Sequence, residues 1–598
     1  MQILLRKQDN ETGTSQAGAS LINAEYTVKY FSVQMDTNPE AQGITPVRTW
    51  VLKTDKDGFS YLDNEWKVRG DDFYYNRKNV PTLPFGTITI QETKAPEGYL
   101  INPEVFVRQI TGTDTPDGVS TYNAPIVPEQ VMKGSVELYK RDSESGNLLA
   151  GAVYGIYFAG NEVGRLTTDQ NGYAKSGLLP YGGYILQEIT APAGYVLDKT
   201  QHQFKIADDG AVVTITATDK NQMGQITGTK LGEVLTGSDF RLTELGMMYA
   251  PIYEQQGLPD AVFEVYAKTD ITTPDGAVKY TAGQLVDTVT SDAAGKFATK
   301  QLYLGTYILR EQTAPNGYVL DTAEHEITLT YGGQNADVIL SSVSLQNDRQ
   351  KVKITLKKAL EENTIYPNPE AYKDVQFGLF VAENILDVNG NIALEKGSLL
   401  EVLTLDDTLT GTTTMDLPIG SYYLQEIATN EAYILDDTRY PIEFVYAGQD
   451  IPTVEVVANN GLHIANSLKK GTLRITKKDA DSQLLAGAEI EILTTDMQPI
   501  IVGTTDDNGQ FSAELPLGDY LYREIKAPDG YVLNDTIQPV TISEHEQLIE
   551  VELLNDLIPP PQTGDTSMAV YIIYAALTSG FIALAIFAIQ AKRRRNSL

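Results

Sequence analysis

Five glutamates recur in this chain at positions where a β-strand would bury them. In the copy Tyr184-Ile-Leu-Gln-Glu188, the first, third and fifth side chains share one strand face, because side chains alternate with a period of two. A carboxylate on an apolar face is costly unless it is protonated or paired. Each glutamate precedes a tyrosine by seven residues, and the five are Glu92, Glu188, Glu311, Glu426 and Glu524. The repetition predicts that each of the five glutamates is buried beside partner side chains.

The first partner is a lysine on a second recurring strand. Its pattern is apolar-x-apolar-x-Lys, as in Val136-Glu-Leu138-Tyr-Lys140. The lysine again falls on the apolar face. The five lysines are Lys7, Lys140, Lys230, Lys358 and Lys477.

The second partner is an Asn or Asp on a short strand that closes each repeat. A spacing of 31 residues from the glutamate selects Asn123, Asp219 and Asn555, and the closing strands of the other two repeats give Asn347 and Asn466. An acceptor also precedes the next lysine by 11 residues in three repeats, which selects Asp219 over Asn221.

A lysine, a glutamate and an Asn or Asp in an apolar interior can form an amide bond. Desolvation lowers the pKa of a lysine and raises that of a glutamate. A neutral amine is a nucleophile, and a protonated glutamate can carry protons to the leaving group. We therefore expect a self-made Lys–Asn isopeptide bond with loss of ammonia in each repeat, or loss of water with Asp219. The alternative is a set of buried ion-pair and hydrogen-bond networks without covalent bonds, and the fourth repeat, which lacks the Pro and Gly of the motif, favours the bond least.

The composition excludes several other functions. A net charge of −33 argues against nucleic-acid binding. With no cysteine, thiolate metal sites and disulfides are impossible, and the four histidines are scattered singly. Turns such as Thr54-Asp55 to Gly58 lack the acidic residues of a calcium loop and are predicted to be hairpin turns. We expect no cofactor and no metal.

The tyrosine-, threonine- and valine-rich composition, with Gly- and Asp-rich turns, predicts an all-β chain of several domains. The lysine strand, the Glu-x-x-Ala-Pro-x-Gly-Tyr box and the terminal Asn resemble the Cna B-type domains of Gram-positive surface proteins and pilins. That resemblance implies transthyretin-like, reverse-immunoglobulin β-sandwiches arranged in a rod, with internal isopeptide bonds. The expected domains are residues 1–127, 133–222, 223–349, 350–467 and 468–557, with insertions in the first, third and fourth.

Residues 558–598 resemble a cell-wall sorting signal. Pro-Gln-Thr563-Gly564 precedes an apolar run from Met568 to Ala591 and a basic tail. The run is long enough for a transmembrane helix. By the resemblance, a sortase would cleave between Thr563 and Gly564 and join Thr563 to peptidoglycan or to another pilin subunit. A permanent membrane anchor is the alternative, and Pro560 in place of the usual leucine leaves the sortase class open.

These features predict a surface stalk, adhesin or minor pilus subunit on the cell wall of a Gram-positive bacterium, without enzymatic turnover. A polymerising shaft pilin is the alternative, with Lys133 as its weak acceptor lysine, and a wall hydrolase is a further one. Because no export signal follows Met1, we also expect a longer natural N-terminus. Aromatic clusters in the insertions, Trp50, Trp66, Phe73 to Tyr75, and Met247 to Tyr253, are expected to pack in or between domains, with ligand binding as the alternative.

Overall fold

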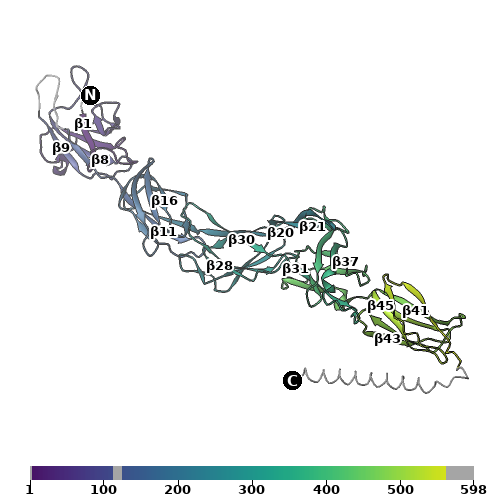
Figure 1. Ribbon diagram of the computed structural model, residues 1–598. Helices are drawn as coiled ribbons and strands as arrows, with labels where there is room; N and C mark the ends of the chain where they lie inside the picture. The colour runs from purple at the N-terminus through teal and green to yellow at the C-terminus, as the bar shows by residue number, and fades with distance from the viewer. Residues whose placement is uncertain (1–2, 112–123, 561–598) are drawn as a thin grey trace, which may run out of the picture. The chain divides into compact units, whose positions relative to one another are not determined.

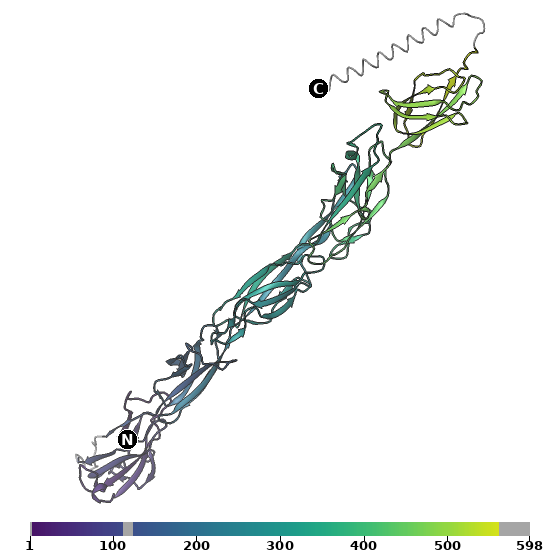
Figure 2. The same ribbon diagram turned by 90° about the horizontal axis from the view of Figure 1, so that it is seen from below.

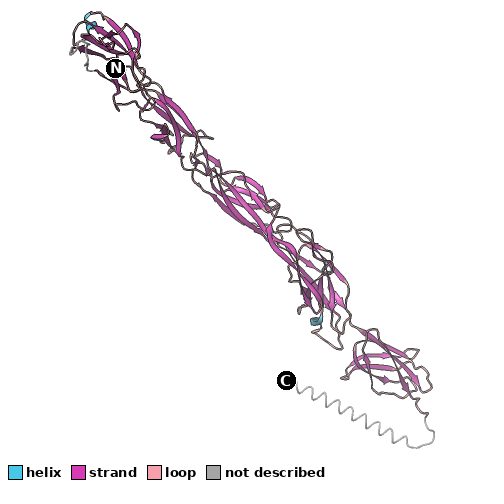
Figure 3. Ribbon diagram, turned by 90° about the horizontal axis from the view of Figure 1, so that it is seen from above, coloured by secondary structure: helices cyan, strands magenta, loops and turns pink. Residues whose placement is uncertain are grey.

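The computed structural model describes residues 3–111 and 124–560. Within these ranges the chain is built of β-strands, and its helical turns are 3-10 turns at Pro39–Gln42, Ala371–Asp374 and Asn459–Gly461 (Figure 3). The predicted all-β class is confirmed. No helix in the described ranges is long and apolar enough to cross a membrane. The expected transmembrane run from Met568 to Ala591 lies outside them.

The second domain shows the plan of two packed sheets. In one sheet β11 (Lys133–Asp142) lies between β14 (Tyr173–Lys175) and β19 (Val212–Asn221), with β15 (Leu179–Pro180) and β17 (Tyr195–Val196) at the margins. The other sheet runs β13 (Asn161–Thr167), β12 (Val153–Phe158), β16 (Gly182–Thr190), β18 (Gln201–Ile206). Both sheets place alternate apolar side chains in one shared core, which includes Val136, Leu138, Tyr154, Leu186 and Ile206.

The fifth domain repeats this plan. Its first sheet has β41 (Lys470–Asp479) between β44 (Gln510–Pro516) and β47 (Leu548–Asn555). Its second sheet runs β43 (Pro499–Thr504), β42 (Glu489–Thr494), β45 (Gly518–Lys526), β46 (Gln538–Ile542). The first and last strands are parallel neighbours, and the glutamate strand lies in the facing sheet.

The first domain has the same two sheets with an insertion. One holds β10 (Ile126–Glu129), β1 (Ile3–Asp9) and β4 (Phe59–Tyr61). The other holds β5 (Lys67–Gly70), β3 (Arg48–Lys53), β2 (Glu25–Phe31), β8 (Gly86–Lys94) and β9 (Val105–Ile110), and β6 (Tyr74–Tyr75) pairs with β7 (Pro81–Thr82). Strand β10 continues two residues past the expected boundary at 127.

The third domain pairs the first part of β20 (Met223–Thr243) with β30 (Val338–Asn347), β26 (Lys296–Ala298) and β27 (Leu302–Tyr303). Its second sheet runs β25 (Leu285–Thr290), β22 (Val262–Ala267), β28 (Gly305–Thr313), β29 (Glu324–Leu329), and a small hairpin joins β23 (Ile271–Thr272) to β24 (Val278–Tyr280).

The fourth domain pairs β31 (Lys351–Leu360) with β36 (Thr410–Thr412), β39 (Thr453–Val457) and β40 (Ile464–Asn466). Its second sheet contains β35 (Leu399–Thr404), β32 (Gln376–Val381), β37 (Gly420–Ala428) and β38 (Arg439–Phe444), with β33 (Ile385–Leu386) and β34 (Ile392–Leu394) in a separate hairpin. Each of the five domains has its own apolar core, and the strands of each gather into their own body (Figures 1 and 2).

The long hairpin formed by β20 and β21 (Gly246–Gly257) does not stay with the third domain. The described chain falls into two compact units, and the hairpin tip, Val234–Tyr253, belongs to the unit that contains the fourth and fifth domains. Met248 in β21 pairs with Leu399 in β35, and Leu235 and Tyr249 pack against the core of the fourth domain. The expected boundary between residues 349 and 350 therefore misplaces this tip.

Candidate functional site: a buried cluster in each domain

Strand register places the lysine and its acceptor side by side in every domain. In the second domain the parallel pairing sets Lys140 opposite Ala217 and Asp142 opposite Asp219. Asp219 is therefore the diagonal neighbour of Lys140 on the same face of the sheet, within reach of a long side chain. The same register joins Lys7 to Glu129, Lys230 to Asn347, Lys358 to Asn466 and Lys477 to Asn555.

The glutamate reaches this pair from the facing sheet, where a β-bulge aims it. On β16 and β12, Glu188 pairs with Tyr154, and the register shifts immediately beyond this pair. The corresponding shift occurs beside all five glutamates. Bulges are common beside functional sites because the extra residue redirects a side chain. The residues paired with the other glutamates are Tyr26, Phe263, Phe377 and Ile490.

In the third, fourth and fifth domains the predicted acceptor is an asparagine. In the fifth domain Nδ2 of Asn555 donates to Oε1 and Oε2 of Glu524 at 3.0 and 2.9 Å, and Nζ of Lys477 lies 3.3 Å from Oε1. In the third domain Nδ2 of Asn347 lies 3.1 and 2.9 Å from the Glu311 oxygens, and Lys230 lies 3.0 Å from Glu311.

The fourth domain keeps this geometry although its glutamate motif is divergent. Nζ of Lys358 donates to Oδ1 of Asn466 at 2.5 Å and lies 3.0 Å from Oε1 of Glu426. Nδ2 of Asn466 donates to both Glu426 oxygens at 3.0 Å. Loss of the Pro and Gly residues from the motif has therefore not separated the three side chains.

In the second domain the predicted acceptor is an aspartate. Nζ of Lys140 contacts Oδ1 of Asp219, lies 3.0 Å from Oε1 of Glu188, and donates to the hydroxyl of Tyr154 at 2.7 Å. The lysine and both carboxylates have no exposed side-chain surface. A lysine and two acids are thus enclosed together.

The first domain places a residue in the cluster that the sequence did not predict. The register position of the acceptor is occupied by Glu129, whose Oε1 lies 2.5 Å from Nζ of Lys7, and Lys7 also contacts Glu92. The predicted partner Asn123 precedes β10 and lies outside the described residues. The spacing rule missed Glu129 because it follows Glu92 by 37 residues, and because only Asn and Asp were considered as acceptors.

Burial shifts the protonation of these clusters toward the neutral forms. Burial lowers the pKa of Lys230, Lys358 and Lys477, and the adjacent glutamates only partly offset this effect. Burial raises the pKa of the Asp219 carboxyl to about 7, against the pull of Lys140. It raises the pKa of Glu129 to about 8, against the pull of Lys7.

A backbone contact that the sequence reasoning missed orients each glutamate. Oε2 of Glu524 accepts a hydrogen bond at 2.9 Å from the backbone N–H of Asn534, ten residues later, which leaves Oε1 facing Lys477. The equivalent donors are Asn102, Asp198, Asp321 and Asp436. Each of these Asn or Asp side chains then accepts from the backbone two residues on, as in an Asx turn. An Asn or Asp ten residues after each glutamate was the available sequence signal.

The Asp-x-x-Gly turns hold the lysine backbone. The N–H of Lys140 donates to the carbonyl of Gly172 at 2.8 Å, and Asp169 Oδ1 accepts from the turn's own N–H groups. The predicted hairpin turn is wrong here, because the turn joins β13 and β14, which lie in opposite sheets. In the described ranges, no group of three or more His, Asp or Glu is placed to hold a metal ion.

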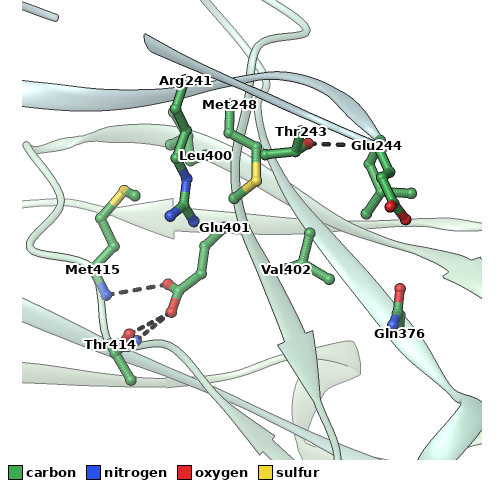
Figure 4. A pocket seen from close by; sticks show the side chains of 11 residues that line it. Arg241, Thr243, Glu244, Met248, Gln376, Leu400, Glu401, Val402, Thr414 and Met415 are labelled. Carbon is green, nitrogen blue, oxygen red and sulfur yellow. Dashed lines mark hydrogen bonds between the residues drawn. The ribbon is translucent and has the colours of Figure 1, made fainter. Parts of the chain in front are cut away.

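A pocket lies apart from these clusters, between the hairpin tip and β35. Its volume is about 720 Å³, and Arg241, Glu244 and Met248 line it opposite Glu401 and Val402 (Figure 4). Glu401 already accepts hydrogen bonds from Thr414 and Met415, at 2.6 to 3.1 Å. The carboxylate therefore fastens the neighbouring loop.

Most of the aromatic residues of the insertions pack in or between domains. Trp50 is fully buried beside Phe73, with 5.5 Å between ring centroids. In the hairpin tip, the hydroxyl of Tyr253 donates to the carbonyl of Asp416 at 3.1 Å. Met248 is buried, whereas Tyr75 and Met247 are exposed.

Tandem two-sheet domains, each enclosing its own lysine cluster, define a multidomain β-sandwich protein. A family model described as SpaA, prealbumin-like fold domain, matches residues 134–221, 252–342, 368–461 and 471–557. The chain belongs to this SpaA prealbumin-like fold family, and the predicted transthyretin-like fold is confirmed.

Individual relatives are more distant. Over 83 residues, 14% of this chain, the sequence is 35% identical to the trypsin-resistant surface T6 protein of Streptococcus pyogenes, and this stretch covers 16% of that relative's length. Among solved structures, the Bacillus anthracis TIE protein is similar with 19% identity over 71% of this chain and 74% of its own, at a TM-score of 0.41. A streptococcal ancillary pilin is similar with 19% identity over 58% of this chain and 98% of its own, at a TM-score of 0.21.

Proposed function

We propose that this chain is a cell-wall-anchored surface stalk, adhesin or minor pilus subunit of a Gram-positive bacterium, whose domains seal themselves with isopeptide bonds. The observation that carries the proposal is the cluster of lysine, glutamate and acceptor, buried at one register in every domain. Membership of the SpaA prealbumin-like family supports a structural role on the cell surface.

The fifth domain illustrates the chemistry. Burial favours the neutral amine of Lys477, which attacks Cγ of Asn555. Glu524, hydrogen-bonded to Nδ2 of the asparagine, receives a proton from the attacking nitrogen and passes it to the departing amide nitrogen. The Nζ–Cγ bond forms, the Cγ–Nδ2 bond breaks, and ammonia leaves. In the second domain Asp219 would lose water instead.

Such a bond would let tension pass through the domain without unfolding it. Lys477 lies near the end of β41 and Asn555 at the end of its parallel neighbour β47. Tension entering at the start of β41 would pass from Lys477 directly to Asn555. The chain between Lys477 and Asn555 would then carry no tension. A stalk of such domains would resist shear and proteolysis without disulfides.

Attachment would follow from the C-terminal segment. A sortase would cleave between Thr563 and Gly564 and transfer Thr563 to peptidoglycan or to another pilin subunit, after the apolar run had held the chain in the membrane. These residues lie outside the described ranges, and their sequence order alone supports this step. Thr563→Ala should move the protein from the wall fraction released by a muramidase into the membrane fraction, and unchanged wall release would contradict the assignment.

A minor or non-polymerising subunit fits better than a shaft pilin. Lys133, the acceptor lysine considered for polymerisation, forms an ion pair with Glu11 at 2.6 Å, and its backbone begins β11. Its ammonium group is therefore engaged. A ladder of high-mass species on denaturing gels would contradict this part of the proposal.

The bond itself is tested by mass. Glu524→Gln keeps the size of the side chain but removes the proton carrier, so the chain should be heavier by about 17 Da than expected for that substitution on a fully linked protein. Glu514→Gln on β44 is the matched control, because Glu514 is exposed, and its mass should change only by the substitution. Equal masses for the two variants would rule out a Glu524-dependent bond.

A further inference from the structure

We infer that the first domain carries a cross-link of a different kind, an amide between Nζ of Lys7 and the side-chain carboxyl of Glu129. This inference rests on the proposed function, because it uses the same reaction with a new acceptor. It makes Glu129 a modification site and replaces the expected pairing of Lys7 with Asn123.

Glu129 lies at the acceptor position of the cluster, in contact with Lys7. It occupies the acceptor register opposite Asp9, as Asp219 does opposite Asp142. Its Oε1 lies 2.5 Å from Nζ of Lys7, and neither side chain has any exposed surface. Contact of this kind gives the groups the effective concentration of an intramolecular reaction.

The charges of the cluster favour a reactive state. Two carboxylates and one ammonium in a dry core would leave an uncompensated negative charge, which is costly. A proton held on Glu129 removes that charge, consistent with the raised pKa of this carboxyl. A neutral carboxylic acid beside an amine is an electrophile that can condense with it, whereas a carboxylate is not.

The first and second domains each have a tyrosine hydroxyl at the same position beside the lysine. Tyr26 accepts a hydrogen bond from Lys7 at 3.1 Å, as Tyr154 does from Lys140 at 2.7 Å. The asparagine-containing domains have Phe263, Phe377 or Ile490 at this position. The two domains with a carboxyl acceptor are thus the two with a tyrosine, which groups Glu129 with the aspartate acceptor.

The reaction balances as a condensation. Glu92 first takes one proton from the Lys7 ammonium, and the neutral Nζ then attacks Cδ of the protonated Glu129. Glu92 passes that proton to the departing hydroxyl and takes a second one from the nitrogen. The Nζ–Cδ bond forms, one C–O bond of Glu129 breaks, and water leaves.

Peptide mass spectrometry of the full chain tests this directly. An amide on Lys7 blocks tryptic cleavage there, so peptide 7–29 should appear joined to peptide 109–133, lighter by about 18 Da than their sum and with fragments that place the link on Glu129. Peptide 109–133 also contains Asn123. A link on Asn123, lighter by about 17 Da, would overturn the inference.

Two further results separate this inference from the proposed function. Separate peptides from the first domain, with linked peptides from the others, would overturn only the Glu129 link. Separate peptides from every domain would overturn both.

Glu129→Gln should change the mass lost on linkage from about 18 to about 17 Da, because ammonia replaces water as the leaving group. Glu129→Ala should abolish the link, and Glu104→Gln, an exposed control in the same domain, should leave it intact.

Discussion

The hydroxyl of Tyr154 accepts a hydrogen bond from Nζ of Lys140 at 2.7 Å, across the core of the second domain. An asparagine acceptor brings its own N–H donor to the glutamate, as Asn555 does to Glu524. A carboxyl acceptor such as Asp219 has no such donor. The tyrosine hydroxyl supplies an additional polar partner where two acids and one lysine are enclosed together.

Tyr154→Phe should slow formation of the bond in the second domain while leaving the fold intact. The ring keeps its place in the core, so stability should fall only by about 1 kcal/mol, the typical net value of one hydrogen bond. The fraction of unlinked peptides from the second domain, measured by mass spectrometry at intervals after refolding, should rise relative to the native chain.

Tyr184→Phe is the matched control for this substitution. Its hydroxyl donates to the carbonyl of Pro180 at 2.7 Å and belongs to the same core, but it makes no contact with the cluster. The control should lose similar stability without slowing the bond. Equal linkage rates in the two variants would show that the Tyr154 hydroxyl has no role in the reaction.

A second prediction concerns substitution of Gly172, because the turn that contains it holds the backbone of Lys140. It has φ of +61°, and a Cβ there would lie 2.7 Å from the carbonyl oxygen of Lys140. Gly172→Ala should therefore displace the lysine strand and lower both stability and linkage rate. Gly151→Ala is the control, since Gly151 has φ of +85° with nothing within 4 Å of a built Cβ.

The two glycine variants share the cost of a left-handed residue, about 1 kcal/mol. Stability should be compared in a Glu188→Gln background, where no covalent bond masks the difference. Only Gly172→Ala should then show an additional loss in denaturant unfolding, and only it should delay linkage in the native background. An equal loss for both would mean that the turn does not position Lys140.

The sequence was sufficient to predict which side chains of the repeating clusters lie together. Strand periodicity predicted the lysines and glutamates, and spacing together with the closing strands predicted Asp219, Asn347, Asn466 and Asn555. The structure brings each of these sets together, and the bonds between them stay a prediction. The spacing rule did not predict Glu129, because the segment between the glutamate strand and the last strand varies in length. Its acidic side chain also breaks the Asn or Asp pattern.

The hairpin tip could not be placed from sequence for a different reason. Its apolar residues, such as Leu235 and Tyr249, have the alternation of any strand, and nothing in that alternation names the surface that covers them. They pack against the core of the fourth domain, contributed by residues more than a hundred positions later. Local patterns specify which face of a strand is buried but not the partner that buries it.

A third prediction concerns the tryptophans, both of which lie in the first domain. Trp50 is fully buried beside Phe73, whereas Trp66 is half-buried. In a Trp66→Phe variant the remaining fluorescence should be shielded from iodide and should report unfolding of the first domain alone. Trp50→Ala should destabilise that domain by about 3–5 kcal/mol. Efficient quenching in the Trp66→Phe variant would indicate an exposed Trp50, as a ligand-binding role would require.

The final prediction compares two adjacent methionines in the hairpin tip. Met248 is 7% exposed and pairs with Leu399 of β35, whereas Met247 is 51% exposed. Met248→Ala should cost about 2 kcal/mol, the lower end of the range for a buried methionine, because the removal of its side chain leaves a cavity. Met247→Ala should change stability by less than about 0.5 kcal/mol. Hydrogen exchange on the full chain should show faster exchange of the hairpin and β35 amides only in the Met248 variant. Unchanged exchange there would mean that the tip does not depend on Met248 for its packing on the fourth domain.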